Sequence, residues 1–195
     1  DRRQRQMCIR DRTQEALRPL RRKFQMIFQD PMSSLNPRRT VFSIIASSLR
    51  LHNFDRVTLR VEEALDMVGL PRDFKYRYPH ELSGGQRQRI GIARAIATEP
   101  AFILADEIVS GLDVSSQAQV LNLIEQLVRD LGLTLAFISH DLSVVRRLCQ
   151  RTIVLYQGEI IEAQQTAKLF ANPSSAYTRE LIKAIPLPNL DQDWI

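Results

Sequence analysis

Residues 82–107 join a glycine-containing turn, an amphipathic helix and an apolar strand that ends in two carboxylates. The turn lies at Ser83-Gly84-Gly85, and one stripe of the helix that follows it carries Ile90, Ala93, Ile96 and Ala97. Glycines let a backbone approach a ligand closely, and amides at a helix N-terminus attract anions such as phosphate. The strand ends in Asp106 and Glu107, the pair with which nucleotide hydrolases hold magnesium and orient water. Together these features predict a nucleotide-hydrolysing site.

Five segments, in this order along the chain, resemble the motifs of ATP-binding cassette (ABC) ATPases. Gln29 is similar to the glutamine of the Q-loop, and Leu82 to Gln86 resembles the ABC signature. Phe102 to Glu107 resembles the Walker B strand, Ser110 to Asp113 the D-loop, and Ser139 to Asp141 the switch-histidine segment. The resemblance implies an α/β fold of the P-loop NTPase type, a parallel sheet core with a helical subdomain that carries the signature segment (residues 82–86).

The resemblance also divides the chain into three parts. Residues 1–12 match nothing in the family and are expected to be a disordered or artefactual leader. Residues 13–185 are expected to form a partial ABC ATPase domain, with its helical subdomain at about 41–98. Residues 186–195 are expected to form a C-terminal tail.

Hydrophobic periodicity predicts the elements of this fold. Apolar runs predict strands at 24–28, 101–105 and 134–138, the last two typical of a parallel sheet covered on both faces. Two further strands are predicted within 151–163, around a turn at Gln157-Gly158. Helices are predicted at 41–51, 56–68, 117–131, 166–171 and 176–184, and the second has an inner face of Leu59, Ala64, Leu65 and Val68.

Charge and hydropathy exclude several classes of protein. The net charge is +5, but residues 1–23 hold nine basic and three acidic residues, so the rest of the chain is close to neutral. This distribution argues against a nucleic-acid function. No run of about 18 apolar residues could span a membrane. Cys8 and Cys149 lack metal-type spacing and favour a reducing compartment.

The resemblance implies that ATP and Mg²⁺ are the cofactors. It implies that Asp106 holds Mg²⁺, with Gln29 as a further contact to the metal or to water. Glu107 is implied to polarise the water that attacks the γ-phosphate. His140 is implied to hydrogen-bond the γ-phosphate and to hold Glu107 and the water in place. Glu107 and His140 are therefore the expected catalytic residues, and Gln29 is expected to link the nucleotide to a neighbouring subunit.

The signature segment is implied to act across a dimer interface. In ABC proteins two nucleotides are sandwiched head to tail, and each signature binds the γ-phosphate of ATP held by the partner. The resemblance thus implies ATP-binding roles for Ser83, Gly84, Gly85 and Gln86. It implies the same role for Gln29 and Asp113. Asp113 is expected to contact the opposing ATPase subunit, in either a homodimer or a heterodimer.

The sequence departs from the family pattern at three points. Ile108-Val109 replaces the commoner Pro-Thr, and Gly111 replaces Ala in the D-loop. No G-x-x-x-x-G-K-[ST] phosphate loop, the family's Walker A motif, occurs in the 195 residues. We therefore interpret the chain as a fragment without its N-terminal part. Alone it is expected to be inactive, whereas the full-length protein is expected to be an ABC-type ATPase.

Two segments narrow the resemblance to importers of dipeptides, oligopeptides, nickel and glutathione. Residues 29–38 resemble the loop after the Q-loop in that group, and residues 173–182 resemble its C-terminal "PYT" segment. This implies a subunit that energises the import of peptides or related small solutes. The implied partners are membrane permease subunits and, indirectly, a periplasmic or extracellular solute-binding protein. The implied location is peripheral, at the cytoplasmic face of the bacterial inner membrane.

Two other functions stay open at this stage. The first is a non-transport ABC ATPase of DNA repair, chromosome structure or translation, although the sequence contains no coiled-coil or zinc insertion. The second is a catalytically silent regulatory module that uses only its signature segment. A phosphate-loop lysine and permease genes beside the full-length gene would favour the transporter.

Overall fold

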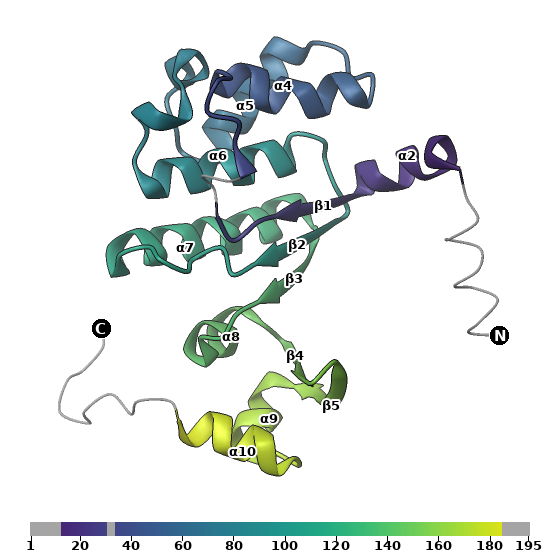
Figure 1. The fold of residues 1–195 in the computed structure, drawn as a ribbon, viewed down its shortest axis with the longest axis vertical. Helices are drawn as coiled ribbons and strands as arrows, with labels where there is room; N and C mark the ends of the chain where they lie inside the picture. Colours follow the sequence, from purple (N-terminus) through teal and green to yellow (C-terminus); the bar gives the residue numbers. More distant parts are fainter. Residues whose placement is uncertain (1–12, 31–33, 185–195) are drawn as a thin grey trace. The chain divides into compact units, whose positions relative to one another are not determined.

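A computed structural model describes residues 13–30 and 34–184, and the chain divides into two compact units (Figure 1). The first unit extends to Ile138 and the second begins at Ser139. The predictions for residues 1–12 and for the tail at 186–195 concern residues outside the described ones.

The first unit contains a three-stranded parallel sheet. Its strands are β1 (Phe24–Ile27), β2 (Phe102–Asp106) and β3 (Thr134–Ile138), in the order β1-β2-β3. Because all three run in the same direction, their carboxyl ends meet at one edge, where open α/β sheets bind ligands. The register pairs Ile27 with Ala105 and Asp106 with Ile138, so the last residues of β1, β2 and β3 lie side by side. The predicted α/β fold with a parallel core is confirmed.

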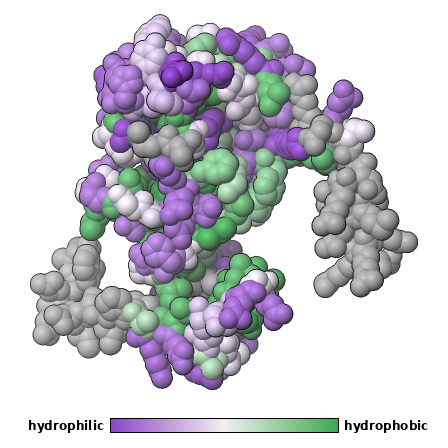
Figure 2. Space-filling view, in the orientation of Figure 1, coloured by the Kyte–Doolittle hydropathy of each residue, from purple (hydrophilic) through white to green (hydrophobic). Residues whose placement is uncertain are grey.

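The two faces of this sheet differ in burial. On one face Ile27, Ile103 and Ala105 are buried. On the other, Phe24 stacks on its register partner Phe102 with ring centroids 4.7 Å apart, yet Phe24 remains 52% exposed. Figure 2 shows hydrophobic residues at the surface beside these strands. Within the described residues the sheet is therefore covered on one face, whereas the sequence predicted cover on both.

Three helices of the first unit pack into a helical subdomain. They are α4 (Val41–Leu51), α5 (Val57–Met67) and α6 (Gly84–Ile96). The fully buried residues of these helices include Ile45, Leu49, Leu65, Ile90 and Ile92. The predicted inner face of α5 is wrong at Leu59, which is 41% exposed, and Val61 is buried in its place. Val61, Ala64, Leu65 and Val68 follow the i, i+3, i+4, i+7 spacing of one helix face.

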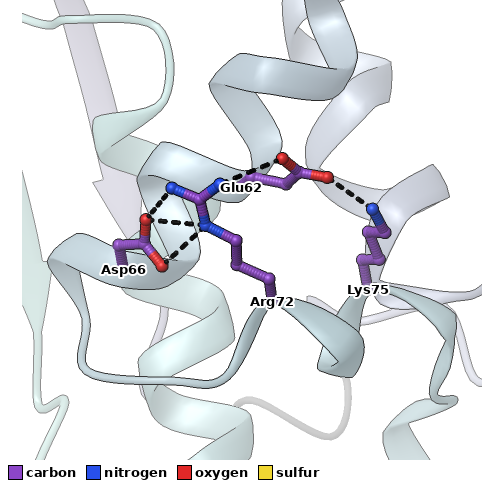
Figure 3. Close-up of polar contacts among 4 residues, drawn as sticks. All are labelled: Glu62, Asp66, Arg72 and Lys75. Atoms are coloured by element: carbon purple, nitrogen blue, oxygen red, sulfur yellow. Dashed lines mark hydrogen bonds and ion pairs between the residues drawn. The ribbon is translucent and has the colours of Figure 1, made fainter.

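Two short 3₁₀ helices connect α5 to α6, namely η1 (Arg72–Tyr76) and η2 (Pro79–Glu81). Charged side chains hold η1 against α5 (Figure 3). Arg72 contacts Asp66 through Nη2 and Oδ2 at 2.6 Å, and Lys75 pairs with Glu62. The hydrogen bond from Lys75 lowers the pKa of Glu62, and the one from Arg72 lowers the pKa of Asp66. The network thereby joins η1 to α5, ahead of the signature segment.

Among the described residues, the first unit also contains α2 (Gln14–Lys23) before β1 and α7 (Val114–Leu131) between β2 and β3. The sequence predicted α7 but not α2, which contains Pro19. Thr13 caps α2, because its Oγ1 accepts a hydrogen bond from the backbone N–H of Ala16 at 3.3 Å. No described helix has the length and apolar character needed to cross a membrane.

As far as Ala184, the last described residue, the second unit consists of a β-hairpin and three helices. These elements are α8 (Leu142–Leu148), β4 (Arg151–Tyr156), β5 (Glu159–Gln165), α9 (Thr166–Ala171) and α10 (Ala176–Lys183). The strands β4 and β5 are antiparallel, which confirms the predicted hairpin. Both turn residues have positive φ, 50° at Gln157 and 85° at Gly158, as the commonest two-residue hairpin turn requires.

Candidate functional site

Glu107 is the first residue after β2, and it is held in an unusual backbone conformation. Its φ is 46°, in the left-handed region that costs energy for a residue with a side chain. Its backbone N–H donates a hydrogen bond to the carbonyl of Ile138 at 3.0 Å. The end of β3 therefore stabilises the turn that directs Glu107 away from the strand. Strain of this kind is concentrated at functional sites.

Gln29 meets Glu107 at the same edge of the sheet. Gln29 follows β1 by two residues, and its Nε2 donates a hydrogen bond to Oε2 of Glu107 at 2.8 Å. The pairing of β1 with β2 explains this contact, because it brings the two strand ends side by side. The structure thus brings together two of the residues predicted for the site. Asp106, the last residue of β2, is adjacent to Glu107 in the chain.

The donor chemistry at this edge fits Mg²⁺. Among the residues described by the structure, no group of three His, Cys, Asp or Glu side chains could hold a metal ion by itself. Magnesium does not need such a group, because it is usually bound through one or two carboxylates together with substrate phosphates and water. Asp106 at the end of β2 offers one carboxylate, and Gln29, which contacts the neighbouring Glu107, offers an amide oxygen. The metal role of these two residues stays a prediction.

The signature segment leads directly into α6 through a capping box. Ser83 is the N-cap, and its Oγ accepts a hydrogen bond from the backbone N–H of Gln86 at 3.3 Å. In return, Oε1 of Gln86 accepts one from the backbone N–H of Ser83 at 3.0 Å. This reciprocal arrangement fixes the first turn of the helix, where unpaired amides attract anions. Sequence reasoning assigned both residues to ATP binding and missed their capping role.

The fold does not itself require the two signature glycines. Neither has a positive φ, and both lie in the first turn of α6. A Cβ atom added at Gly84 would lie 3.7 Å from Cδ2 of Leu112, and one at Gly85 would lie 3.4 Å from Oγ of Ser116. Both are tolerable contacts, so alanine would fit at either position. That the absence of side chains at Gly84 and Gly85 allows a phosphate to approach closely stays a prediction.

The same contacts place the D-loop beside the signature segment. Leu112 faces Gly84, and Ser116 at the start of α7 faces Gly85. Asp113 is the N-cap of α7, and its Oδ1 accepts a hydrogen bond from the backbone N–H of Ser116 at 2.9 Å. That hydrogen bond lowers the pKa of Asp113. Two helix N-termini are thus close to one another, which the sequence motifs did not indicate. The contact of Asp113 with a second subunit stays a prediction.

His140 belongs to the second unit and precedes α8. The neighbouring Asp141 is the N-cap of that helix, since its Oδ1 accepts a hydrogen bond from the backbone N–H of Ser143 at 2.9 Å. The local hydrogen bonds define the backbone on both sides of His140, including one from the Asp141 N–H to Oγ of Ser139 at 3.0 Å. The predicted action of His140 on Glu107 is not tested by these contacts.

Comparison with known proteins agrees with the motifs. A family model described as "ABC transporter" matches residues 4–110. The chain is 50% identical over 186 residues to the oligopeptide transport ATP-binding protein OppF of Bacillus subtilis, covering 93% of the chain and 61% of that protein. It is 53% identical over 178 residues to a putative peptide import ATP-binding protein of Brucella ovis, covering 90% of the chain and 56% of that protein. The chain thus spans about three fifths of the length of these curated relatives.

The fold of the chain is also similar to solved structures. The ATP-binding cassette MJ0796, in a dimeric post-hydrolysis state bound to ADP and Pi, is 31% identical and aligns with a TM-score of 0.68 over 80% of the chain and 68% of that structure. The cbiO1 protein of Clostridium perfringens, part of the ABC transporter complex cbiONQ, is 26% identical. It aligns with a TM-score of 0.74 over 90% of the chain and 69% of that structure.

Proposed function

The chain belongs to the ABC transporter family, and we propose that the whole protein hydrolyses ATP to energise the import of peptides or related small solutes. The observation that carries this proposal is the contact between Gln29 and Glu107 at the carboxyl edge of the sheet. It joins two separate family motifs in one place, as a hydrolytic site requires.

In the proposed reaction water attacks the γ-phosphate of ATP, and the bond to the β–γ bridging oxygen breaks to give ADP and phosphate. Glu107 orients and polarises the water, and Gln29 holds the Glu107 carboxylate by the 2.8 Å hydrogen bond. Asp106 would hold Mg²⁺, which would neutralise charge on the phosphates. His140 would stabilise the γ-phosphate from the segment before α8. Each residue therefore contributes positioning or charge rather than covalent chemistry.

We propose that two such subunits bind ATP head to tail. Ser83 caps α6, and the N-terminus of this helix presents backbone amides that attract anions. Gly84 and Gly85 would leave room there for a phosphate. The start of α7, capped by Asp113, lies beside this surface and would contact the second subunit. Because ATP would then be shared between subunits, its binding would close the dimer and its hydrolysis would release it.

The import of peptides is proposed from the relatives, whose printed names refer to oligopeptide transport and peptide import. The proposed partners are permease subunits in the membrane and, through them, a solute-binding protein outside it. The proposed location is the cytoplasmic face of the bacterial inner membrane. The 195 residues alone are proposed to be inactive, because they contain no phosphate loop to cradle ATP.

The test uses the whole protein together with its permease in lipid vesicles. We expect Mg²⁺-dependent ATP hydrolysis that rises when a peptide-loaded binding protein is added outside the vesicles. Hydrolysis that does not respond to any member of a broad peptide pool would contradict the peptide assignment. For the 195-residue chain, calorimetry with ATP should detect no tight binding, and a micromolar affinity would contradict its proposed inactivity.

A further inference from the structure

Arg94 on α6 forms a contact that none of the motifs explains. Its Nη1 donates a hydrogen bond of 2.6 Å to the backbone carbonyl of Ser34, which is 60 residues away in the sequence. The side chain is partly buried, and burial lowers the pKa of Arg94. A guanidinium that gives up hydration to bind a main-chain carbonyl fixes the position of that carbonyl, because a charged donor makes a strong hydrogen bond.

Ser34 lies in the segment that begins at Gln29. Its backbone N–H donates a hydrogen bond to the carbonyl of Asp30, the residue after Gln29, at 3.1 Å. The next residue, Leu35, is 1% exposed and therefore anchored in the core. At one end of the segment, Gln29 donates a hydrogen bond to Glu107. At the other end, Ser34 accepts a hydrogen bond from Arg94, and Leu35 is buried.

The helix that carries Arg94 begins at the signature segment. Ser83 caps α6 and Arg94 is in its last turn, so one continuous helix of about 16 Å connects the two. The capping box holds the first turn rigidly, and the buried residues Ile90 and Ile92 hold the middle. A displacement at the signature segment would therefore move Arg94, and with it the carbonyl of Ser34.

We propose that Arg94 is a positioning residue that ties the signature helix to the Gln29 segment, so that the state of the signature segment sets the contact between Gln29 and Glu107. This inference rests on the proposed ATPase function. It adds a physical connection between the signature segment and the contact of Gln29 with Glu107. Arg94 would act through the carbonyl of Ser34 and through the hydrogen bond from the Ser34 N–H to Asp30, the residue after Gln29.

The first experiment measures steady-state ATP hydrolysis by the whole protein with Arg94→Met. We expect kcat to fall about tenfold while KM for ATP stays within about twofold, because orientation of Glu107 is lost but the phosphate contacts remain. Arg89→Met is the matched control. Arg89 lies on the same helix and also donates to a main-chain carbonyl, that of Val68 at 3.3 Å, but it does not reach the Gln29 segment. Its kcat should stay within about twofold of the wild type.

A double-mutant cycle with Gln29→Ala separates positioning from general stability. If Arg94 acts through Gln29, Arg94→Met should change kcat by less than about twofold once Gln29→Ala is present. Losses of kcat that multiply in the double variant would overturn the proposal, as would equal losses in Arg94→Met and Arg89→Met. Arg94→Lys keeps the charge with a single ammonium and enters the same cycle if Arg94→Met does not fold.

The outcomes also distinguish this inference from the proposed function. If the wild-type protein hydrolyses ATP and Glu107→Gln abolishes that activity, the proposed function stands, and independent losses at Arg94 and Gln29 then contradict the positioning role alone. If the wild type does not hydrolyse ATP, the proposed function and the inference fail together.

Discussion

Gln29 and Glu107 are 78 residues apart in the sequence, yet Nε2 of Gln29 donates a hydrogen bond to Oε2 of Glu107 at 2.8 Å. The parallel pairing of β1 with β2 brings them together, and the hydrogen bond from the Glu107 N–H to the Ile138 carbonyl fixes the turn. The sheet therefore places the Glu107 carboxylate, on a residue with positive φ, within hydrogen-bond distance of the Gln29 amide.

This contact makes Gln29→Ala informative. In the whole protein we expect the turnover of ATP to fall by about 10- to 100-fold, since a hydrogen bond to a charged group contributes roughly 1.5–3 kcal/mol. Gln25→Ala is the matched control, because Gln25 lies on the same strand and its Nε2 donates to the carbonyl of Arg21 at 2.9 Å. Steady-state ATP hydrolysis measures the effect of each substitution. Equal effects of the two substitutions would show that the loss comes from the strand and not from the contact with Glu107.

Gly84→Ala should separate folding from ligand approach. The added methyl has room in the chain and alanine favours a helix, so the melting temperature should stay the same or rise slightly. ATP-driven dimerisation should nevertheless be lost, because the methyl would occupy the space proposed for the phosphate. Gly91→Ala, farther along α6 with nothing within 4 Å of the added atom, should leave dimerisation intact. Light scattering with and without ATP would measure the difference, and a normal dimer of Gly84→Ala would refute the close approach.

Asp113 has two roles to distinguish, a helix cap and a dimer contact. Asp113→Asn keeps the cap, since asparagine is as good an N-cap as aspartate, so the melting temperature should not change. Asp113→Ala should lower the melting temperature, because the hydrogen bond to the Ser116 N–H is lost. If the charge acts across the dimer, Asp113→Asn should weaken ATP-driven association. Wild-type association of that variant would leave Asp113 with the capping role alone.

Glu162 should make the stability of the second unit depend on pH. Burial of Glu162 would raise its pKa, but the backbone N–H groups of Ser174, at 2.8 Å, and Ser175, at 3.1 Å, outweigh burial and lower the pKa from 4.5 to about 2. The lowered value means that the charge stabilises the fold fully above pH 4.5, and that this stabilisation disappears as the pH falls from 4.5 towards 2.

Glu162→Gln should therefore lower stability at pH 7 by about 1–2 kcal/mol, a few degrees in Tm. The gap from the wild type should shrink as the pH falls below 4.5. Glu159→Gln, at an exposed position on the same strand, is the control and should have little effect. Thermal melts from pH 7 to pH 3.5 measure both variants, and a gap for Glu162→Gln that does not change with pH would contradict the role of its charge.

Much of the fold could be predicted from the sequence. The strand β3 and the helices α4 and α9 have the predicted boundaries, because strong apolar periodicity or an apolar run marks their whole length. The hairpin follows from Gln157-Gly158, whose positive φ values match the turn. The meeting of Gln29 with Glu107 was expected only through the family resemblance, since nothing in the local sequence sets the distance between two strands.

Other features could not be predicted because they depend on tertiary contacts. The sequence did not predict α2, because the helix contains Pro19 and many charged residues and shows little apolar periodicity. Thr13, as its N-cap, helps to stabilise it. The inner face of α5 was misplaced by two residues at Leu59, since several apolar positions compete and only packing against α4 and α6 decides. The hydrogen bond from Arg94 to Ser34 joins residues 60 positions apart. Its acceptor is a backbone carbonyl, which every residue has, so no sequence pattern indicates it.

The central claim is that Glu107 is the carboxylate that activates water for ATP hydrolysis. The most direct measurement is turnover and ATP binding by the whole protein with Glu107→Gln. The amide keeps the shape of the side chain and can still accept the hydrogen bond from Gln29, but it lacks the charge that polarises water. We expect turnover to fall by a factor of about 100 or more, with ATP affinity nearly unchanged and an ATP-bound dimer that no longer opens. Turnover equal to that of the wild type would contradict the account and place the base at another residue.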